Sequence, residues 1–427
     1  MNKLTSKFYL VGIKGSGMAS LACVLYDLGN YVIGSDKEEN FGFEEGIYKR
    51  KIKTLDFNKD NIKKGYTYIV SNAYHDENEE VLRIKELGCK YYYYHEFIGK
   101  MKGIHIAVSG THGKTTTTKI IVDMLKDEKI AYVIGDGTGG AVKDYKYLIY
   151  EACEYQDHFL IYKPDFLVVN KIELDHPDYF NSVEQVYSSF EKLTKQSKNV
   201  IIKNDNGLKV KSNFITYGLS EADYQYKIIE ENTDGFIVEI KGLTTDKITL
   251  PFYGYHMIDN FISGYIVLKK LGYTSDFIKS KIKNIILPKR RMEEEIFKKQ
   301  IIVKDYAHHP TEIKALYDAL RQKYPKKEMV VFFQPHTYTR TLSLKSAFLN
   351  ALDCFDEVYV FPTFSSAREK SDLDLQAQVN EVFRKYHNVE DFSKIDVDKT
   401  SKIYIFLGAG ALYKYVEAFK EKFLKIN

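Results

Sequence analysis

The chain has 427 residues, 44% of them hydrophobic, and its 62 Lys plus Arg against 58 Asp plus Glu give a formal net charge of +4. At about 100 to 200 residues per domain, this length predicts two to four domains with cores of their own, which excludes a mainly disordered chain. The near balance of charge excludes a general electrostatic binder of nucleic acid or membrane surfaces. Because the chain also lacks a run of roughly 18 apolar residues and a secretory segment, we expect a cytoplasmic protein.

Short apolar runs typical of strands recur along the chain, mostly with helix-like segments between them, and this alternation predicts parallel α/β sheets. From about residue 213 to 252, apolar and polar residues alternate around an Asp234-Gly235 turn, which predicts a small antiparallel sheet in the middle of the chain. The expected strands are 8–11, 104–108, 166–169, 301–303, 330–333, 358–361 and 404–407.

Two breaks divide this series of strands. One falls near residues 100–103, before a strand and a glycine-bearing loop, and the other near 287–289, where a proline follows an amphipathic helix. We therefore expect three domains, made of residues 1–100, 101–287 and 288–427.

The first loop that could bind a ligand is residues 11–18, Val-Gly-Ile-Lys-Gly-Ser-Gly-Met, which follows a strand and leads into a helix. Asp36 ends the next strand about 20 positions later, where a dinucleotide-binding turn meets a ribose hydroxyl. Ser20 stands where a third glycine is expected. The residues alone leave open an NAD site, another nucleotide diphosphate site and a structural turn.

The most informative loop is residues 108–116, Val-Ser-Gly-Thr-His-Gly-Lys-Thr-Thr, between an apolar strand and an amphipathic helix. Glycines let backbone N–H groups turn onto phosphate oxygens, Lys114 can bridge the β and γ phosphates, and the Thr115 hydroxyl can ligate Mg²⁺. Val108 occupies the first glycine position of the standard motif, but the strand, loop and helix in order favour a phosphate loop over an ordinary turn.

Acidic and basic groups then gather at strand ends. Residues 151–154 and 173–178 carry carboxylates and one imidazole that suit Mg²⁺ near phosphates, although acidic strand ends also serve as helix caps. Arginines further along offer a fixed fork for a carboxylate or phosphate. The later polar segments are 255–260, 289–291, 305–310 and 334–340.

With these segments in hand, the chain resembles the Mur ligases, the ATP-dependent amide-bond-forming enzymes of peptidoglycan synthesis. The resemblance runs from Gly12 to Gly410, and its last two motifs are most similar to those of the members that add L-alanine. The motifs that carry it are residues 12–18, 110–118, 151–155, 175–180, 289–293, 305–312 and 334–341.

The resemblance implies a three-domain α/β enzyme. A Rossmann-like N-terminal domain would hold a UDP sugar, a central P-loop-type ATPase domain would combine a parallel sheet with a small antiparallel one, and a Rossmann-like C-terminal domain would bring the amino acid. The implied substrates are UDP-N-acetylmuramate and L-alanine, with ATP and Mg²⁺, and the chain would act as a monomer or homodimer. The first glycine loop would then be a UDP-diphosphate site and not an NAD site.

Site residues follow from position in the matched motifs. The resemblance implies an ATP set of Gly110, Thr111, His112, Gly113, Lys114, Thr115, Thr116, His256, Asn260, Arg291 and Asp305. The implied metal ligands are Thr115, Glu151 and His176, with Glu154 as a further candidate. The implied UDP-sugar set is Gly15, Ser16, Gly17, Asp36 and Ser71. The implied amino-acid set is Tyr306, His308 and Arg340, and the implied catalytic residues are Lys114, His308, His336 and Arg340.

The sequence departs from the family pattern at three positions. Lys304 stands where an aspartate is expected, Lys171 where an asparagine is expected, and Ala411 at a position that is often aspartate. Lys304 is expected to add a cation near the ATP ribose.

Three other functions remain open at this point. A nicotinamide-dependent oxidoreductase would leave the second glycine loop without a role. Intact Lys114, Glu151 and His176 argue against a non-catalytic nucleotide-binding relative. Within the family, the nearest alternative is a murein-recycling ligase that attaches a tripeptide to the same sugar nucleotide.

Overall fold

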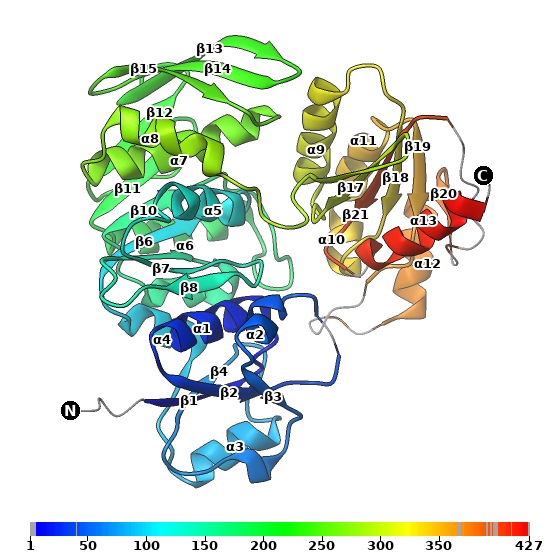
Figure 1. The fold of residues 1–427 in the computed structure, drawn as a ribbon. Coiled ribbons are helices and arrows are strands. Elements are labelled where there is room, and N and C mark those ends of the chain that lie inside the picture. The colour runs from blue at the N-terminus through cyan, green and yellow to red at the C-terminus, as the bar shows by residue number, and fades with distance from the viewer. Residues whose placement is uncertain are drawn as a thin grey trace.

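In the part of the chain that the structure describes, the strands form three separate sheets, arranged along the chain from N- to C-terminus (Figure 1). The computed structural model describes residues 6–39, 41–364, 369, 371–389, 392, 395, 400–410 and 412–425. The expected α/β fold with three sheet-containing domains is confirmed.

The N-terminal sheet is parallel, with strand order β3-β2-β1-β4-β5. Its strands are β1 (Lys7–Val11), β2 (Tyr31–Ser35), β3 (Lys53–Leu55), β4 (Thr67–Val70) and β5 (Tyr91–Tyr93). Its helices are α1 (Ser16–Asp27), α2 (Glu45–Lys49), η1 (Lys59–Asn61), α3 (Glu79–Glu86) and α4 (Tyr94–Lys100). The α1 helix packs against strand β8 of the next sheet, so one apolar cluster joins the first two units.

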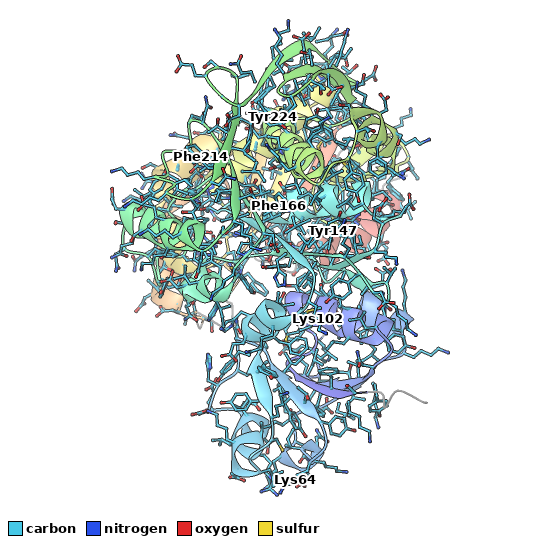
Figure 2. The ribbon with its side chains drawn as sticks, turned by 90° about the vertical axis from the view of Figure 1, so that its left-hand side faces the viewer. Lys64, Lys102, Tyr147, Phe166, Phe214 and Tyr224 are labelled. Carbon is cyan, nitrogen blue, oxygen red and sulfur yellow. The ribbon has the colours of Figure 1, made fainter. Side chains whose placement is uncertain are left out.

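The central sheet has ten strands in the order β15-β14-β13-β12-β11-β10-β6-β9-β7-β8. They are β6 (Ile104–Ser109), β7 (Ile130–Val133), β8 (Gly139–Ala141), β9 (Tyr147–Glu151), β10 (Phe166–Val169), β11 (Asn199–Lys203), β12 (Phe214–Gly218), β13 (Tyr224–Asn232), β14 (Gly235–Lys241) and β15 (Thr245–Leu250). Figure 2 labels Tyr147, Phe166, Phe214 and Tyr224 on four of these strands, in their order across the sheet.

The antiparallel strands expected between residues 213 and 252 are present, but they do not form a sheet of their own. Strand β12 pairs in parallel with β11, and a short parallel pairing of Tyr217 with Tyr224 joins β13 to it. The hairpin of β13 and β14 closes where Asn232 pairs with Gly235. The antiparallel part is therefore an extension of the parallel sheet, which local alternation of residues does not reveal.

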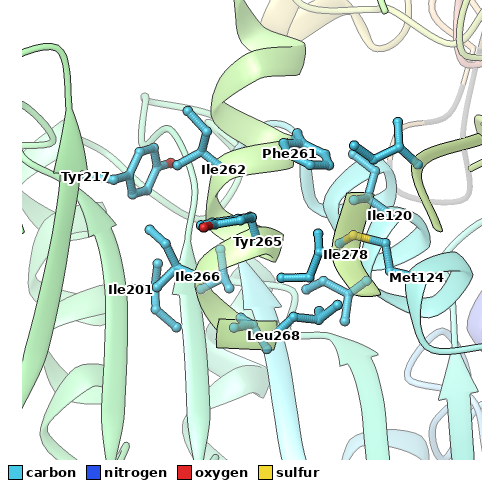
Figure 3. Close-up of a cluster of buried hydrophobic side chains, with 14 of the residues drawn as sticks. Ile120, Met124, Ile201, Tyr217, Phe261, Ile262, Tyr265, Ile266, Leu268 and Ile278 are labelled. Atoms are coloured by element: carbon cyan, nitrogen blue, oxygen red, sulfur yellow. The ribbon is translucent and has the colours of Figure 1, made fainter. Parts of the chain in front are cut away.

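Helices cover both faces of the central sheet. They are α5 (Lys114–Met124), η2 (Tyr155–Ile161), α6 (Val183–Lys195), α7 (Tyr255–Lys270), α8 (Ser275–Lys281) and η3 (Ile282–Asn284). Figure 3 shows the core on one face, where Phe261 and Tyr265 of α7 lie among Ile120 of α5, Ile201 of β11 and Ile278 of α8. This packing fixes α5 and α7, the two helices whose N-termini reach the phosphate loop.

The C-terminal sheet has the order β16-β17-β21-β18-β19-β20, with only β16 antiparallel among the described strands. Its strands are β16 (Glu293–Phe297), β17 (Gln300–Asp305), β18 (Met329–Phe333), β19 (Glu357–Val360), β20 (His387–Asn388) and β21 (Ile403–Leu407). Its helices are α9 (Pro310–Lys323), α10 (Tyr338–Ser343), α11 (Lys345–Leu352), α12 (Leu373–Val382), η5 (Leu412–Lys414) and α13 (Tyr415–Lys425). Helix α9 faces α7 of the central unit (Figure 1), which brings loops of the two units together.

Candidate active site

The loop after β6 has a shape that only glycine allows at two positions. Gly110 and Gly113 have φ angles of +132° and +81°. A Cβ on Gly110 would lie 2.8 Å from the Cβ of Asn170, and one on Gly113 would lie 2.6 Å from Oδ1 of Asn260. The loop is therefore pressed against the end of β10 and against α7, and its backbone shape is held by these two asparagines.

Lys114 opens helix α5 and turns its ammonium back into this loop. Its Nζ donates to the carbonyl oxygens of Gly110 and Thr111, and to Oε2 of Glu154 at 2.9 Å. Burial alone would lower the pKa of Lys114, but the neighbouring acidic groups, Glu154 foremost and Glu151 among them, together outweigh burial and raise it. A permanent cation therefore lies at the phosphate loop.

The expected metal ligands fall into two groups on either side of Lys114. The Thr115 hydroxyl donates to Oε2 of Glu151 at 3.1 Å, and the other Glu151 oxygen accepts from the backbone N–H of Gly135 at 2.5 Å. Nε2 of His176 lies 4.0 Å from Oε1 of Glu154. Carboxylate and hydroxyl oxygens are the donors that a hard cation such as Mg²⁺ prefers, so Thr115 with Glu151 suits it chemically. The second group offers an imidazole nitrogen beside a carboxylate that already pairs with Lys114, so it suits the ion less well.

The residues expected to meet the nucleotide base and ribose line one cavity of about 330 Å³ between α7 and the C-terminal unit. His256 and Asn260 line it from α7, and Arg291 and Asp305 line it from the other side, with Thr116 and Gly113 of the loop. Burial, and then the charge of Arg291, lower the pKa of His256 to about 4, so this imidazole is neutral at pH 7. The Asp305 carboxylate accepts from the backbone N–H groups of Met292 and Ala307 at 2.6 and 2.8 Å.

The residues expected on the amino-acid side gather at the ends of β17 and β18. The rings of His308 and His336 are 5.6 Å apart, and the ring of Tyr306 is 5.4 Å from that of His308. Nη1 of Arg340 lies 3.3 Å from the carbonyl oxygen of His336. The remaining donors of Arg340 meet the central unit, because Nε and Nη2 donate to Oδ1 of Asp175 at 2.9 and 2.8 Å.

His112 of the phosphate loop lies between two carboxylates from different units. Its Nε2 is 2.9 Å from Glu173 of the central unit, and its Nδ1 is 3.3 Å from Glu312 of helix α9. Burial alone would lower its pKa, but Glu173 and then Glu312 outweigh burial and raise the pKa of His112 to about 9. The ring is therefore a buried cation at neutral pH.

Three potential ligand atoms of His112, Glu173 and His309 lie within 4.8 Å of one another. Metal binding needs a neutral imidazole with a free lone pair, whereas a protonated His112 donates from both nitrogens. Hydrogen bonding and charge pairing therefore account for this cluster.

We expect the charged His112 to make stability pH-dependent. Its pKa is raised from 6.5 to about 9 in the folded chain, so its contribution is complete below pH 6.5 and is lost as the pH rises through 9. Between about pH 7 and pH 10, the melting temperature of the wild type should fall by a few degrees more than that of His112→Gln. An equal fall of the melting temperature with pH in the two proteins would contradict this prediction.

The residues expected to bind a UDP sugar meet at the N-terminus of α1. Gly12 has a φ of +82°, and a Cβ there would lie 2.8 Å from the Cβ of Ser71. Asp36 is buried and its Oδ2 accepts from the backbone N–H of Lys14 at 2.7 Å, which ties the glycine loop to the end of β2. A Cβ on Gly17 would lie 2.8 Å from the ring of Tyr94. Gly15 and Ser16 begin α1, whose N-terminal N–H groups suit an anion.

Family models match the chain in three consecutive parts. The Mur ligase family catalytic domain matches residues 7–103, the Mur ligase middle domain 108–268, and the Mur ligase glutamate ligase domain 290–402. A UDP-N-acetylmuramate–L-alanine ligase of Lacticaseibacillus paracasei is 38% identical over 97% of this chain and 98% of that protein. The chain belongs to the Mur ligase family.

Solved structures share the fold of this Mur ligase. The UDP-N-acetylmuramate–alanine ligase of Thermotoga maritima superposes with a TM-score of 0.81 at 23% identity, covering 99% of this chain and 100% of that one. A murein peptide ligase of Psychrobacter arcticus gives a TM-score of 0.72 at 16% identity, covering 98% of each chain.

Two of the three departures from the family pattern are paired with carboxylates in this Mur ligase. Nζ of Lys304 is 2.5 Å from Glu293 on strand β16, so its charge is balanced there. Nζ of Lys171 is 2.6 Å from Glu173. Ala411 lies outside the described residues.

Sequence reasoning missed three carboxylates at the centre of this site. Asp175 pairs with Arg340, Glu173 pairs with His112, and Glu312 of α9 lies between His112 and Arg291. Each belongs to a motif that was noticed: Glu173 and Asp175 come shortly before His176, and Glu312 lies four residues after His308. No signal in the sequence tells that the partners of Asp175 and Glu312 lie on another unit.

Membrane-spanning helices are absent from the part of the chain that the structure describes, because none there is both long and apolar enough.

Proposed function

We propose that this Mur ligase joins L-alanine to the lactyl carboxylate of UDP-N-acetylmuramate, with ATP converted to ADP and phosphate, in the synthesis of peptidoglycan precursors. The observation that carries the proposal is the 38% identity, over 97% of the chain, to a relative named for this reaction. The phosphate loop and the two histidine segments of the C-terminal unit support it, because they face each other across one site.

The chemistry requires activation of a poor electrophile. A lactyl carboxylate oxygen attacks the γ-phosphorus of ATP, ADP leaves, and an acyl phosphate forms. The neutral amine of L-alanine then attacks the acyl carbon, the C–N bond forms, and the C–O bond to phosphate breaks, with release of inorganic phosphate and of one amine proton, while the amide nitrogen keeps the other. Enclosure between the units keeps water from the acyl phosphate.

Charged side chains of the chain serve the first step. Lys114 and Arg291 stabilise the negative charge that spreads over the transferring phosphoryl group, which is the main task in such reactions. Asn260 and His256 hold the adenine side, and Asp305 meets the ribose. The loop residues that accompany them are Gly110, Thr111, His112, Gly113, Thr115 and Thr116.

His308 and His336 serve the second step with Tyr306 and Arg340. Nδ1 of His308 lies 3.1 Å from the carbonyl oxygen of Tyr306, and a carbonyl only accepts, so Nδ1 carries the hydrogen. Burial lowers the pKa of His308 to about 4. The neutral ring therefore has its lone pair on Nε2, where it can accept a hydrogen bond from the incoming amine.

We assign Mg²⁺ to Thr115 and Glu151 on one side of Lys114 and to His176, with Glu154, on the other. When bound, the ion neutralises charge on the phosphates. The UDP sugar is assigned to Gly15, Ser16, Gly17, Asp36 and Ser71. The three domains are assigned the boundaries 1–100, 101–287 and 288–427.

Glu151→Gln should raise the Mg²⁺ concentration for half-maximal activity about 10-fold or more, because an amide offers one neutral oxygen in place of a carboxylate. The measurement is a Mg²⁺ titration of ADP formation at saturating substrates. Glu184→Gln, an exposed change on α6, is the matched control. An unchanged titration for Glu151→Gln would remove this residue from the metal site.

The activity itself is tested by phosphate release. We expect release only when UDP-N-acetylmuramate and L-alanine are both present with ATP and Mg²⁺. ATP turnover that is indifferent to the sugar nucleotide would sink the proposal. The second candidate, a murein-recycling ligase, shares this fold, as the likeness to a murein peptide ligase at a TM-score of 0.72 shows. Side-by-side assays with L-alanine and with the tripeptide separate the two.

A further inference from the structure

We propose that Glu312 is a positioning residue of the ligase reaction, whose buried carboxylate docks the C-terminal unit onto His112 of the phosphate loop and holds Arg291 and His308 in place. The inference rests on the proposed function and deepens it.

The two oxygens of Glu312 divide their contacts between two parts of the site. Oε1 lies 3.3 Å from Nδ1 of His112 and 3.6 Å from Nη1 of Arg291, on the phosphate side. Oε2 accepts from the backbone N–H of His308 at 3.1 Å and lies 3.4 Å from its Nδ1, on the amino-acid side. One carboxylate therefore touches a group from the central unit and two from the C-terminal unit.

The sequence around Glu312 explains why it reaches this point. Pro310 is the first residue of α9, His309 caps the helix, and Glu312 lies in its first turn. Proline suits that first position, and a carboxylate in the first turn is favoured by the helix dipole. The side chain is only 13% exposed, so its charge needs the partners that surround it.

The contact with His112 couples closure of the C-terminal unit to the phosphate loop. The other ring nitrogen of His112 is held by Glu173, so the loop residue next to Gly113 is fixed from both units at once. Thr311 of α9 also donates to Glu173 at 2.7 Å, beside the same contact. When the C-terminal unit moves away, His112 loses this carboxylate, whereas Arg291 and His308 keep it.

The contact with His308 fixes an orientation that the second step needs. Because Nδ1 of His308 faces both Oε2 of Glu312 and the carbonyl oxygen of Tyr306, its hydrogen stays on that nitrogen. The lone pair of the ring is thereby kept on Nε2. Loss of the carboxylate leaves a single acceptor to hold the ring.

The test compares Glu312→Gln with the wild type. A glutamine of the same shape lacks the charge and one acceptor, so we expect kcat to fall about 30-fold or more, as when one partner of a buried charged pair is removed. The KM for UDP-N-acetylmuramate should stay within about two-fold, because the contacts of Glu312 are with His112, Arg291 and His308 and not with the residues assigned to the UDP sugar. Asp318→Asn, an exposed change two turns along the same helix, is the matched control and should keep the wild-type kcat.

A double-mutant cycle with His112→Gln distinguishes positioning from general damage. If Glu312 acts through His112, the double variant should lose about five-fold less than the product of the two single losses. Strictly multiplicative losses, or a kcat for Glu312→Gln within about three-fold of the wild type, would overturn the proposal.

Two further measurements keep the outcomes apart. If Glu312→Gln does not fold, Glu312→Asp replaces it; this variant keeps the charge but withdraws it by one methylene, and a kcat near the wild-type value would then overturn the proposal. A wild-type chain that shows no ligase activity would instead defeat the proposed function, whereas an active wild type with an equally active Glu312→Gln defeats only this inference.

Discussion

Lys114→Ala is expected to lower kcat by about 100-fold or more, since charge stabilisation of this kind is usually worth a few kcal/mol in the transition state. The ammonium is held at the loop by Gly110, Thr111 and Glu154, and its raised pKa keeps it charged at any assay pH near neutrality. Alanine removes the charge and leaves Glu154 buried without its main partner. ADP formation at saturating UDP-N-acetylmuramate, L-alanine, ATP and Mg²⁺ measures the loss.

The matched control is Lys126→Ala, which removes an exposed lysine just beyond the end of α5. It should keep the wild-type kcat. A near-normal kcat for Lys114→Ala would remove this residue from the chemical step and would weaken the assignment of the whole loop.

The phosphate loop was predictable because its signal is local. A strand, two glycines at positions of positive φ, a lysine and a helix follow one another within residues 104–124, and each imposes its geometry on its neighbours. The central strands were predictable for the same reason, since their apolar runs are buried on both faces of a parallel sheet.

The contacts between units were not predictable from the sequence alone. Arg340 and Asp175 are 165 residues apart in the chain, and the packing of the C-terminal unit against the central unit, with α9 against α7, brings them together. Thr337 adopts a φ of +67°, a conformation that costs a β-branched residue of order 1–3 kcal/mol. No glycine stands at this turn, so the sequence gives no sign of its positive φ. The turn lies between His336 and Arg340, two residues of the site.

Arg340 was expected to meet the carboxylate of alanine, and its surroundings add a second task. Its side chain is 4% exposed and that of Asp175 is 9% exposed, so the pair is buried between the two units. Burial alone would raise the pKa of Asp175, but the charges of His176 and Arg340 hold it well below its usual range. A carboxylate that is both buried and ionised is strongly destabilising when its guanidinium partner is removed.

Arg340→Ala should therefore lower kcat/KM for L-alanine by about 100-fold or more, because removing one partner of a buried ion pair costs about 3–5 kcal/mol and the fork for the substrate is lost with it. Initial rates at varied L-alanine concentration measure the loss of substrate binding. Melting curves without substrates measure the loss of the buried ion pair. Arg340→Lys keeps the charge but not the planar fork, so it should recover only part of the loss.

The Asp175→Asn variant decides between the two tasks of Arg340, binding alanine and docking the C-terminal unit. If Arg340 only meets alanine, Asp175→Asn should leave the KM for alanine unchanged or lower it, because the fork is released. If the pair docks the C-terminal unit, Asp175→Asn should reduce kcat/KM and the melting temperature in the same direction as Arg340→Ala. Unchanged kinetics and an unchanged melting temperature in Arg340→Ala would refute both tasks. Neither a contact with alanine nor the ion pair with Asp175 would then contribute to activity or stability.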